Sequence, residues 1–195
     1  MRRKTFDLIA AAGGAVLTVM LIAAGALGLW GYNYAHSNVH DQLAQQQITF
    51  PVLGNAALAS PKIGPYLNQY AGQELLTGPQ AKAYADHFIA VHLSEMPLGG
   101  VYSQVSAASR ANPSDAALKA EVQTSFQGTT LRGLLLEAYA FWTIGQVALV
   151  GAIVAFILAG IMLVLTALGF WHFRRTPEDL EFPKSLHHER VPAGV

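Results

Sequence analysis

The chain has 195 residues, of which 52% are hydrophobic and only 12% are charged. That charged fraction is about half of the ~25% typical of soluble domains, which indicates a membrane protein. The 12 acidic residues balance the 12 basic ones, which argues against nucleic acid as a partner, and the lack of cysteine excludes disulfides, thiolate metal sites and catalytic thiols.

An uncharged apolar run over residues 8–32 predicts a first transmembrane helix. At ~1.5 Å per residue, this run exceeds the ~30 Å hydrocarbon core of a bilayer. Basic residues precede it, and aromatic residues typical of a membrane interface follow it: Trp30, Tyr32 and Tyr34. The alternative is a secretory signal peptide cleaved near Ala24-Gly25-Ala26, which the length of the run and a second span disfavour.

The region over residues 33–137 is predicted to be an external helical domain. No stretch shows the sustained alternation, rich in β-branched residues, that is typical of strands. We expect the first span to continue as a polar helix to Gln47, and a loop to follow as far as Pro65. Two helices then follow, over residues 66–75 and 79–96, because Gly78 can close the first and Pro79 suits the first position of the second.

Two further helices are predicted over residues 102–109 and 112–126. Asn112 is the expected N-cap of the second, with Asp115 in its first turn. Thr129 or Thr130 can then cap a final long helix that becomes the second span. The predicted architecture is therefore all-α, with two transmembrane helices carrying a small external helical bundle.

The second apolar run, over residues 138–173, is longer than a bilayer requires, so we expect an interfacial segment followed by a transmembrane helix. Basic residues lie beside the chain ends, at positions 2–4 and 174–175, whereas the five basic residues of the middle region are spread thinly. The positive-inside rule then places residues 1–7 and the tail 174–195 in the cytoplasm of a multi-pass cell-membrane protein.

Small residues recur every four positions in both spans, at Ala10, Gly14 and Thr18 and at Gly151, Ala155 and Ala159. Such spacing lets helix backbones approach closely. One interpretation is a docking face for another membrane protein. The other, which we favour, is that the two spans pack on each other or that an alanine-rich sequence produces the spacing by chance.

Two histidines one helical turn apart, His36 and His40, are candidate ligands for a transition metal such as zinc or copper. His87 and His92 could join them if the helices converge. The favoured alternative is that the spacing of His36 and His40 arises by chance, since histidine is common at membrane interfaces, and that His92 is a hydrogen-bonded core residue. The sequence contains neither a nucleophile-elbow motif nor a phosphate-binding glycine loop.

Four segments resemble a family of small actinobacterial two-span membrane proteins without an established function: residues 34–43 (YAHSNVHDQL), 62–67 (KIGPYL), 80–93 (QAKAYADHFIAVHL) and 130–136 (TLRGLLL). Together with both spans, the resemblance covers most of the chain and implies a two-span topology. Some members carry the label of the small subunit of an aromatic ring-opening dioxygenase, whose iron is usually held by two histidines and a carboxylate. That subunit is soluble and no such set is recognisable here, so an envelope enzyme is our third hypothesis.

Our leading hypothesis is a non-catalytic accessory or scaffold subunit of a cell-envelope or respiratory membrane complex. Its expected partners are the lipid bilayer and either another membrane protein or further copies of the chain, and no cofactor is expected. The second hypothesis is an external metal-binding or sensing module that uses His36 and His40.

Overall fold

The computed structural model describes residues 3–175 and 177 of the chain. Of these residues 84% are helical and none belongs to a strand, which confirms the all-α prediction. The chain divides into two compact units, one formed by Met1–Gly28 with Val150–Val195 and the other by Leu29–Leu149. We call these the helix-pair unit and the central unit. Arg2 and the predicted tail from Thr176 onward, apart from Pro177, lie outside the described residues.

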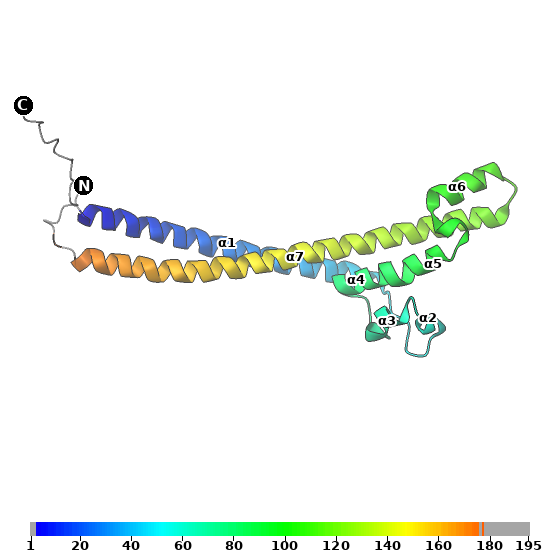
Figure 1. Ribbon diagram of the computed structural model, residues 1–195, viewed down its shortest axis with the longest axis horizontal. Helices are drawn as coiled ribbons and strands as arrows, with labels where there is room; N and C mark the ends of the chain where they lie inside the picture. Colours follow the sequence, from blue (N-terminus) through cyan, green and yellow to red (C-terminus); the bar gives the residue numbers. More distant parts are fainter. Residues whose placement is uncertain (1–2, 176, 178–195) are drawn as a thin grey trace, which may run out of the picture. The chain divides into compact units, whose positions relative to one another are not determined.

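Two long helices, α1 (Arg3–Gln46) and α7 (Ala116–Arg175), each contribute to both units (Figure 1). Both are long and apolar enough to cross a membrane, judged by length and composition. Only 17% of the most apolar window in α1 and 11% of that in α7 is buried inside the protein. The core helix of a soluble protein would be mostly buried, whereas most of the apolar surface of these two windows is exposed.

In the helix-pair unit, α1 and α7 contact each other through small residues. The buried positions of α1 are Ala11, Thr18 and Gly25, and those of α7 are Ala152, Ala155, Ala159 and Thr166. They recur at intervals of three, four or seven residues, the spacing of helices that pack at a small left-handed crossing angle. The small side chains allow the close approach, since a Cβ atom on Gly169 would lie 3.4 Å from that of Ala11.

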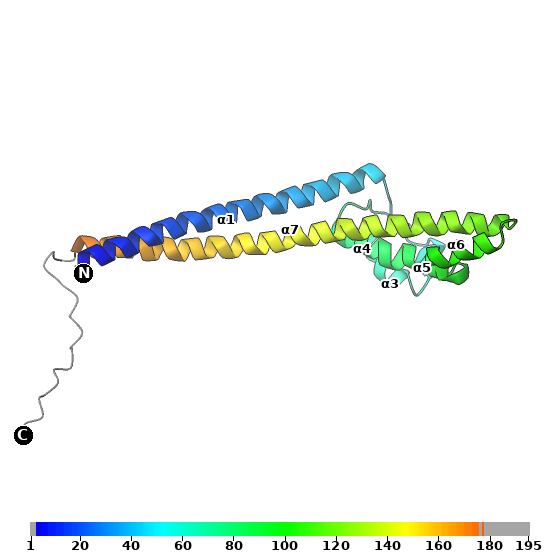
Figure 2. The same ribbon diagram turned by 90° about the horizontal axis from the view of Figure 1, so that it is seen from above.

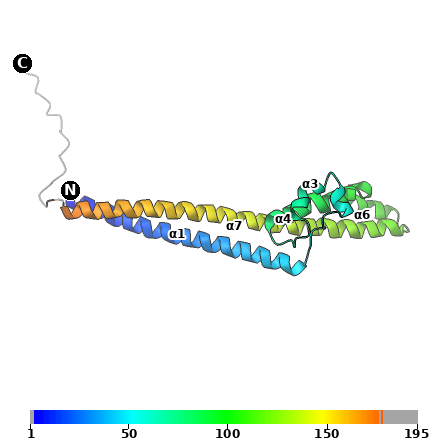
Figure 3. The same ribbon diagram turned by 90° about the horizontal axis from the view of Figure 1, so that it is seen from below.

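In the central unit, a chain of short helices connects α1 to α7. They are α2 (Ala56–Ala59), α3 (Gly64–Leu67), the 3₁₀ turn η1 (Asn68–Tyr70), α4 (Gly78–Tyr84), the π-helical turn η2 (Ala85–Ile89), α5 (Ala90–Ser94), the 3₁₀ turn η3 (Pro97–Gly100) and α6 (Tyr102–Ala111). Figures 2 and 3 show α4, α5 and α6 beside the amino-terminal half of α7.

The segments α4, η2 and α5 form one continuous helix that runs antiparallel to α7. Its start contacts α7 at Trp142, where Gly78 lies against the indole, and its end contacts α7 at Gly128, which lies against Leu93. Thr77 caps this helix, because its hydroxyl accepts from the backbone N–H of Gln80 and the Gln80 side chain accepts from the backbone of Thr77.

The core of the central unit lies where the apolar faces of α1, α4 and α7 meet. Leu43 of α1 and Leu135 of α7 are buried there, together with Phe50 and Leu75 from the connecting segments. The ring of Phe50 is 5.2 Å from that of Tyr70 and 5.4 Å from that of Tyr84 between centroids. These contacts bring residues that are far apart in the sequence together in one hydrophobic core.

Two expectations about the connecting segments were wrong. The helix expected over residues 66–75 ends at Tyr70, because Gly72 adopts a positive φ of 71° and the chain then extends into a bridge between Thr49 and Glu74. Asn112 does not open a helix but ends α6, and the Asp115 carboxylate takes the capping role by accepting from the backbone N–H of Leu118 at 3.0 Å.

The expected break between two helices near Thr129 is also absent, since α7 is continuous from Ala116 to Arg175. Gly128 lies inside this helix, where its missing side chain leaves room for Leu93: a Cβ atom there would lie 2.7 Å from Leu93 Cδ2. The glycine therefore serves contact between helices, and the two threonines that follow it lie in mid-helix.

Candidate functional site

The two histidines proposed as metal ligands lie in different surroundings. The His36 ring packs between Tyr32 and Trp142, with centroid distances of 4.2 Å and 3.6 Å, and its Nε2 lies 3.3 Å from Nε2 of Gln146. Burial lowers the pKa of His36 below its ordinary value, despite a hydrogen bond with the backbone of Trp142 that acts in the opposite direction. The His36 side chain is therefore packed at the contact between α1 and α7.

His40 is exposed and its Nδ1 lies 3.2 Å from the Asp41 carboxylate. The structure does not bring His87 or His92 to this pair. His87 stacks on Tyr66 at 3.6 Å, and Nδ1 of His92 lies 2.7 Å from the Phe88 carbonyl oxygen. Across residues 3–175, no group of three or more His, Asp or Glu side chains is arranged to hold a metal ion.

Two basic side chains of the central unit pair with Asp86, on the π-helical turn η2. One carboxylate oxygen accepts from Lys82 Nζ at 2.5 Å, and the other accepts from a terminal nitrogen of Arg132 at 3.0 Å. Lys82 Nζ also lies 5.5 Å from the centroid of the Tyr139 ring. We call these four residues the Asp86 cluster. It joins α4, η2 and α7 through polar contacts.

The electrostatics of the Asp86 cluster favour an ionised carboxylate. Burial by itself would raise the pKa of Asp86, but the hydrogen bonds and positive charges of Lys82 and Arg132 outweigh it and lower that pKa below its ordinary value. Asp86 is 22% exposed, whereas Lys82 and Arg132 are 47% and 41% exposed. Both cations thus remain partly accessible to solvent, while one carboxylate contacts both of them.

Neither Asp86 nor Arg132 was among the predicted site residues. The i, i+4 spacing of Lys82 and Asp86 was a local sign of a helical ion pair. No local pattern could indicate Arg132 as the second partner, because it is 46 positions from Asp86 and its approach depends on the packing of α4 on α7.

Some of the small residues predicted to lie at a helix contact are buried, and others are exposed. Thr18 and Ala159 are 4% exposed and Ala155 is 9% exposed, whereas Ala10 and Gly151 face outward. A Cβ atom on Gly14 would lie 2.6 Å from Thr166 Oγ1, and one on Gly151 would meet nothing within 4 Å. The contact between the two helices therefore includes Ala152, and Gly151 lies outside it.

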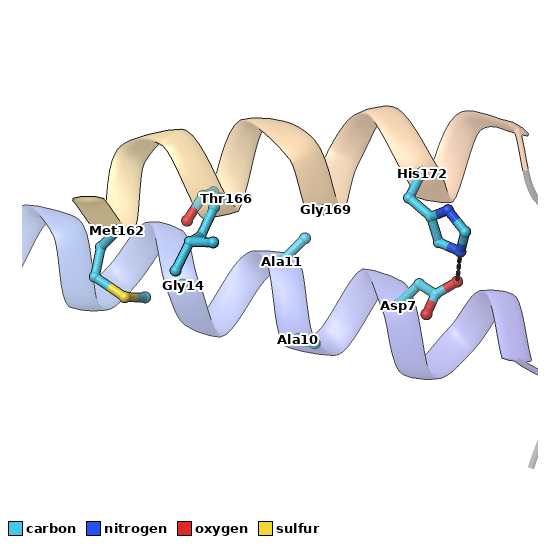
Figure 4. A pocket seen from close by; sticks show the side chains of 9 residues that line it. Asp7, Ala10, Ala11, Gly14, Met162, Thr166, Gly169 and His172 are labelled. Carbon is cyan, nitrogen blue, oxygen red and sulfur yellow. Dashed lines mark ion pairs between the residues drawn. The ribbon is translucent and has the colours of Figure 1, made fainter. Parts of the chain in front are cut away.

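A narrow crevice of about 180 Å³ lies between α1 and α7 in the helix-pair unit (Figure 4). Asp7 and His172 point toward one another at one end, with 3.8 Å between the carboxylate and Nε2. Gly14 and Thr166 face each other further along. The Thr18 hydroxyl donates to the Gly14 carbonyl at 2.8 Å. The remaining lining is mostly apolar, so the crevice is a helix–helix contact with a polar rim.

No protein-family model, curated protein or solved structure matches this chain.

Proposed function

We propose that the chain is a two-span membrane protein whose external helical domain acts as a non-catalytic accessory or scaffold subunit of a cell-envelope or respiratory membrane complex. The spans lie within α1 and α7, and the short helices between them form the external domain. Both chain ends lie in the cytoplasm. The family resemblance of segments 34–43, 62–67, 80–93 and 130–136 supports the same topology.

The observation that carries this proposal is the exposed apolar surface of α1 and α7. Large side chains such as Val19, Leu27, Ile153 and Val164 are between 50% and 68% exposed, and similar residues cover the rest of both apolar windows. A soluble monomer rarely exposes such a large continuous apolar surface to water. Lipid tails or the helices of a membrane partner cover it under this proposal.

The cationic ends of the two helices support the proposed orientation. Lys4 Nζ lies 5.6 Å from the ring centroid of Phe173, and the Arg175 guanidinium lies 4.3 Å from that of Trp171. Cations that rest on aromatic rings are typical of the membrane interface, and an excess of basic residues is typical of its cytoplasmic side. Residues 3–7 and 171–175 therefore form the inner boundary in this proposal.

The scaffold role is supported by how the polar side chains of the central unit are used. His36 packs between aromatic rings, Asp86 holds two cations, and the Ser125 hydroxyl donates to the Gly100 carbonyl in the interior. Each of these three side chains makes at least one contact that joins α7 to another segment. Side chains that are engaged in this way stabilise a shape that a partner protein can recognise.

Topology is tested first, using the cysteine-free background. Asn112→Cys and Thr5→Cys each introduce one exposed thiol, the first in the proposed external domain and the second at the proposed inner end. In intact cells, a membrane-impermeant maleimide should label Asn112→Cys alone, and both after membrane disruption. Labelling of Thr5→Cys in intact cells would overturn the proposed orientation.

The subunit role is tested by gentle detergent extraction of the chain with a tag at its carboxyl end, followed by mass spectrometry of co-purifying proteins. A reproducible stoichiometric partner would support the scaffold role, with an unrelated tagged two-span protein as the control. Recovery of the chain alone under several growth conditions would contradict it. Iron and turnover of a catechol in the purified sample would favour the third hypothesis of an envelope enzyme.

A further inference from the structure

The Asp86 cluster lies beside Tyr139 and Trp142, two aromatic residues of the segment expected to lie at the membrane interface. Lys82 Nζ is 5.5 Å from the Tyr139 ring, and the start of its helix contacts Trp142 through Gly78. Arg132 precedes Tyr139 by seven residues, or ~10 Å along α7 at ~1.5 Å per residue. The headgroup layer of a bilayer extends ~5–8 Å beyond the hydrocarbon core on each side, so a long Arg132 side chain can reach it.

The cluster carries an excess of positive charge and of hydrogen-bond donors. Two cations share one carboxylate, and Arg132 Nε is buried without a hydrogen-bond partner among the described residues. The guanidinium uses one terminal nitrogen for Asp86, so its other terminal nitrogen remains for a second anion. Arginine forks and lysine ammonium groups are the side chains that most often bind phosphate oxygens.

The other basic residues of the region between the spans have different surroundings. Lys62 lies 3.9 Å from Glu95, and Arg110 donates to the Ser106 hydroxyl. Lys119 lies in the first turn of α7, more than three turns before Arg132 and further from Tyr139. Of the five basic residues between the spans, Lys82 and Arg132 are thus the pair that converges beside the aromatic residues Tyr139 and Trp142.

We propose that Lys82 and Arg132 bind the phosphate group of an anionic phospholipid in the outer leaflet, while Asp86 acts as a positioning residue that holds both cations toward the headgroup layer. This inference rests on the proposed two-span topology. It adds a specific lipid contact to the scaffold role, because a bound headgroup at the base of α4 stabilises the position of α4 on α7 at the membrane surface.

The test measures retention of phosphatidylglycerol and phosphatidylcholine by the purified full-length chain, using native mass spectrometry and nanodiscs of each lipid. Lys82→Gln with Arg132→Gln removes both cations, and Lys62→Gln with Lys119→Gln is the control with the same loss of charge. We expect the first double variant to lose about tenfold in affinity for phosphatidylglycerol. The control should bind as the wild type does, and phosphatidylcholine should bind weakly to all three.

A third variant separates lipid binding from folding. Lys82→Arg with Arg132→Lys keeps both charges and should retain phosphatidylglycerol, and circular dichroism confirms that each variant is folded. Equal retention by the Lys82→Gln, Arg132→Gln variant and the wild type would overturn the inference, as would equal loss in the control. Displacement of the lipid by inorganic phosphate at the same concentration would assign the cations to a free phosphate, which also overturns it.

The two proposals fail in different ways. Cytoplasmic accessibility of Asn112→Cys would refute the topology whatever the lipid result. External accessibility of Asn112→Cys, combined with unchanged lipid retention in the Lys82→Gln, Arg132→Gln variant, would refute the lipid site alone.

Discussion

Gly78 and Trp142 are in backbone-to-side-chain contact: a Cβ atom on Gly78 would lie 2.4 Å from the Cβ atom of Trp142. The first turn of α4 therefore rests directly on α7. The same tryptophan packs on His36 of α1, so a single side chain joins three helices of the central unit. A larger residue at position 78 must displace α4, because the Cβ atom of Trp142 cannot move without its backbone.

We expect Gly78→Ala to destabilise the central unit by about 1–3 kcal/mol, the usual cost of overpacking a well-packed contact. The measurement is thermal unfolding of the detergent-solubilised chain, followed by circular dichroism. Gly133→Ala is the matched control, because a Cβ atom there meets nothing within 4 Å. It should leave stability unchanged or raise it by up to ~1 kcal/mol through helix propensity. Equal effects of the two changes would contradict the contact.

The helix-pair unit can be tested by cross-linking, since the chain has no native cysteine. Cβ atoms at positions 11 and 169 would lie 3.4 Å apart, close to the ~3.5–4.5 Å range of disulfides. Oxidation of an Ala11→Cys, Gly169→Cys variant in isolated membranes should give an intramolecular cross-link, measured as protection from maleimide. Gly13→Cys with Gly169→Cys should remain reactive. A disulfide-linked dimer in place of the internal cross-link would show that this face joins two copies.

Asp86 should make the central unit less stable in acid. Its pKa is lowered from an ordinary value of 3.8, so its contribution is fully present above that value and is lost as pH falls below it. Because both partner cations are partly exposed, we expect Asp86→Asn to cost about 1 kcal/mol or less at neutral pH. The variant should also show a smaller decrease in stability as pH falls from about 4 toward about 2, the range below the ordinary pKa of the carboxylate.

Thermal unfolding across that pH range checks this prediction, with Asp41→Asn as the control because Asp41 is a strongly exposed carboxylate. An Asp86→Asn variant with the same acid dependence as the wild type would show that Lys82 and Arg132 do not stabilise the ionised carboxylate.

His36 should add a second pH dependence at higher pH. Its pKa is lowered from an ordinary value of 6.5, so the folded chain favours the neutral ring. The associated stability is present above that value and decreases as pH falls through 6.5 toward the lowered pKa. We expect the wild type to be less stable at about pH 5 than at about pH 7.5, and His36→Gln to reduce the difference. His40→Gln is the control variant, because the His40 side chain is exposed.

The sequence by itself determined the helical class and the extent of the two long apolar segments. An apolar run longer than the bilayer core, flanked by basic and aromatic residues, is a local pattern. It can be recognised without knowing which residues it contacts in the folded chain. The helix that continues α1 beyond its apolar run, to Gln46, and the helix that begins near Pro79 were predicted for the same reason, because capping and helical periodicity act within a few residues.

The tertiary structure decided which faces of those helices meet. Residues four apart drift by about 40° around a helix of 3.6 residues per turn, so a strict four-residue spacing cannot follow a long contact line. Two helices that pack closely follow a spacing near 3.5 instead, and the contact therefore passes through Ala11 and Ala152 and leaves Ala10 and Gly151 outside. The pairing of Asp86 with Arg132 and the contact of Gly78 with Trp142 were decided in the same way, because each depends on α4 packing against a helix far along the chain.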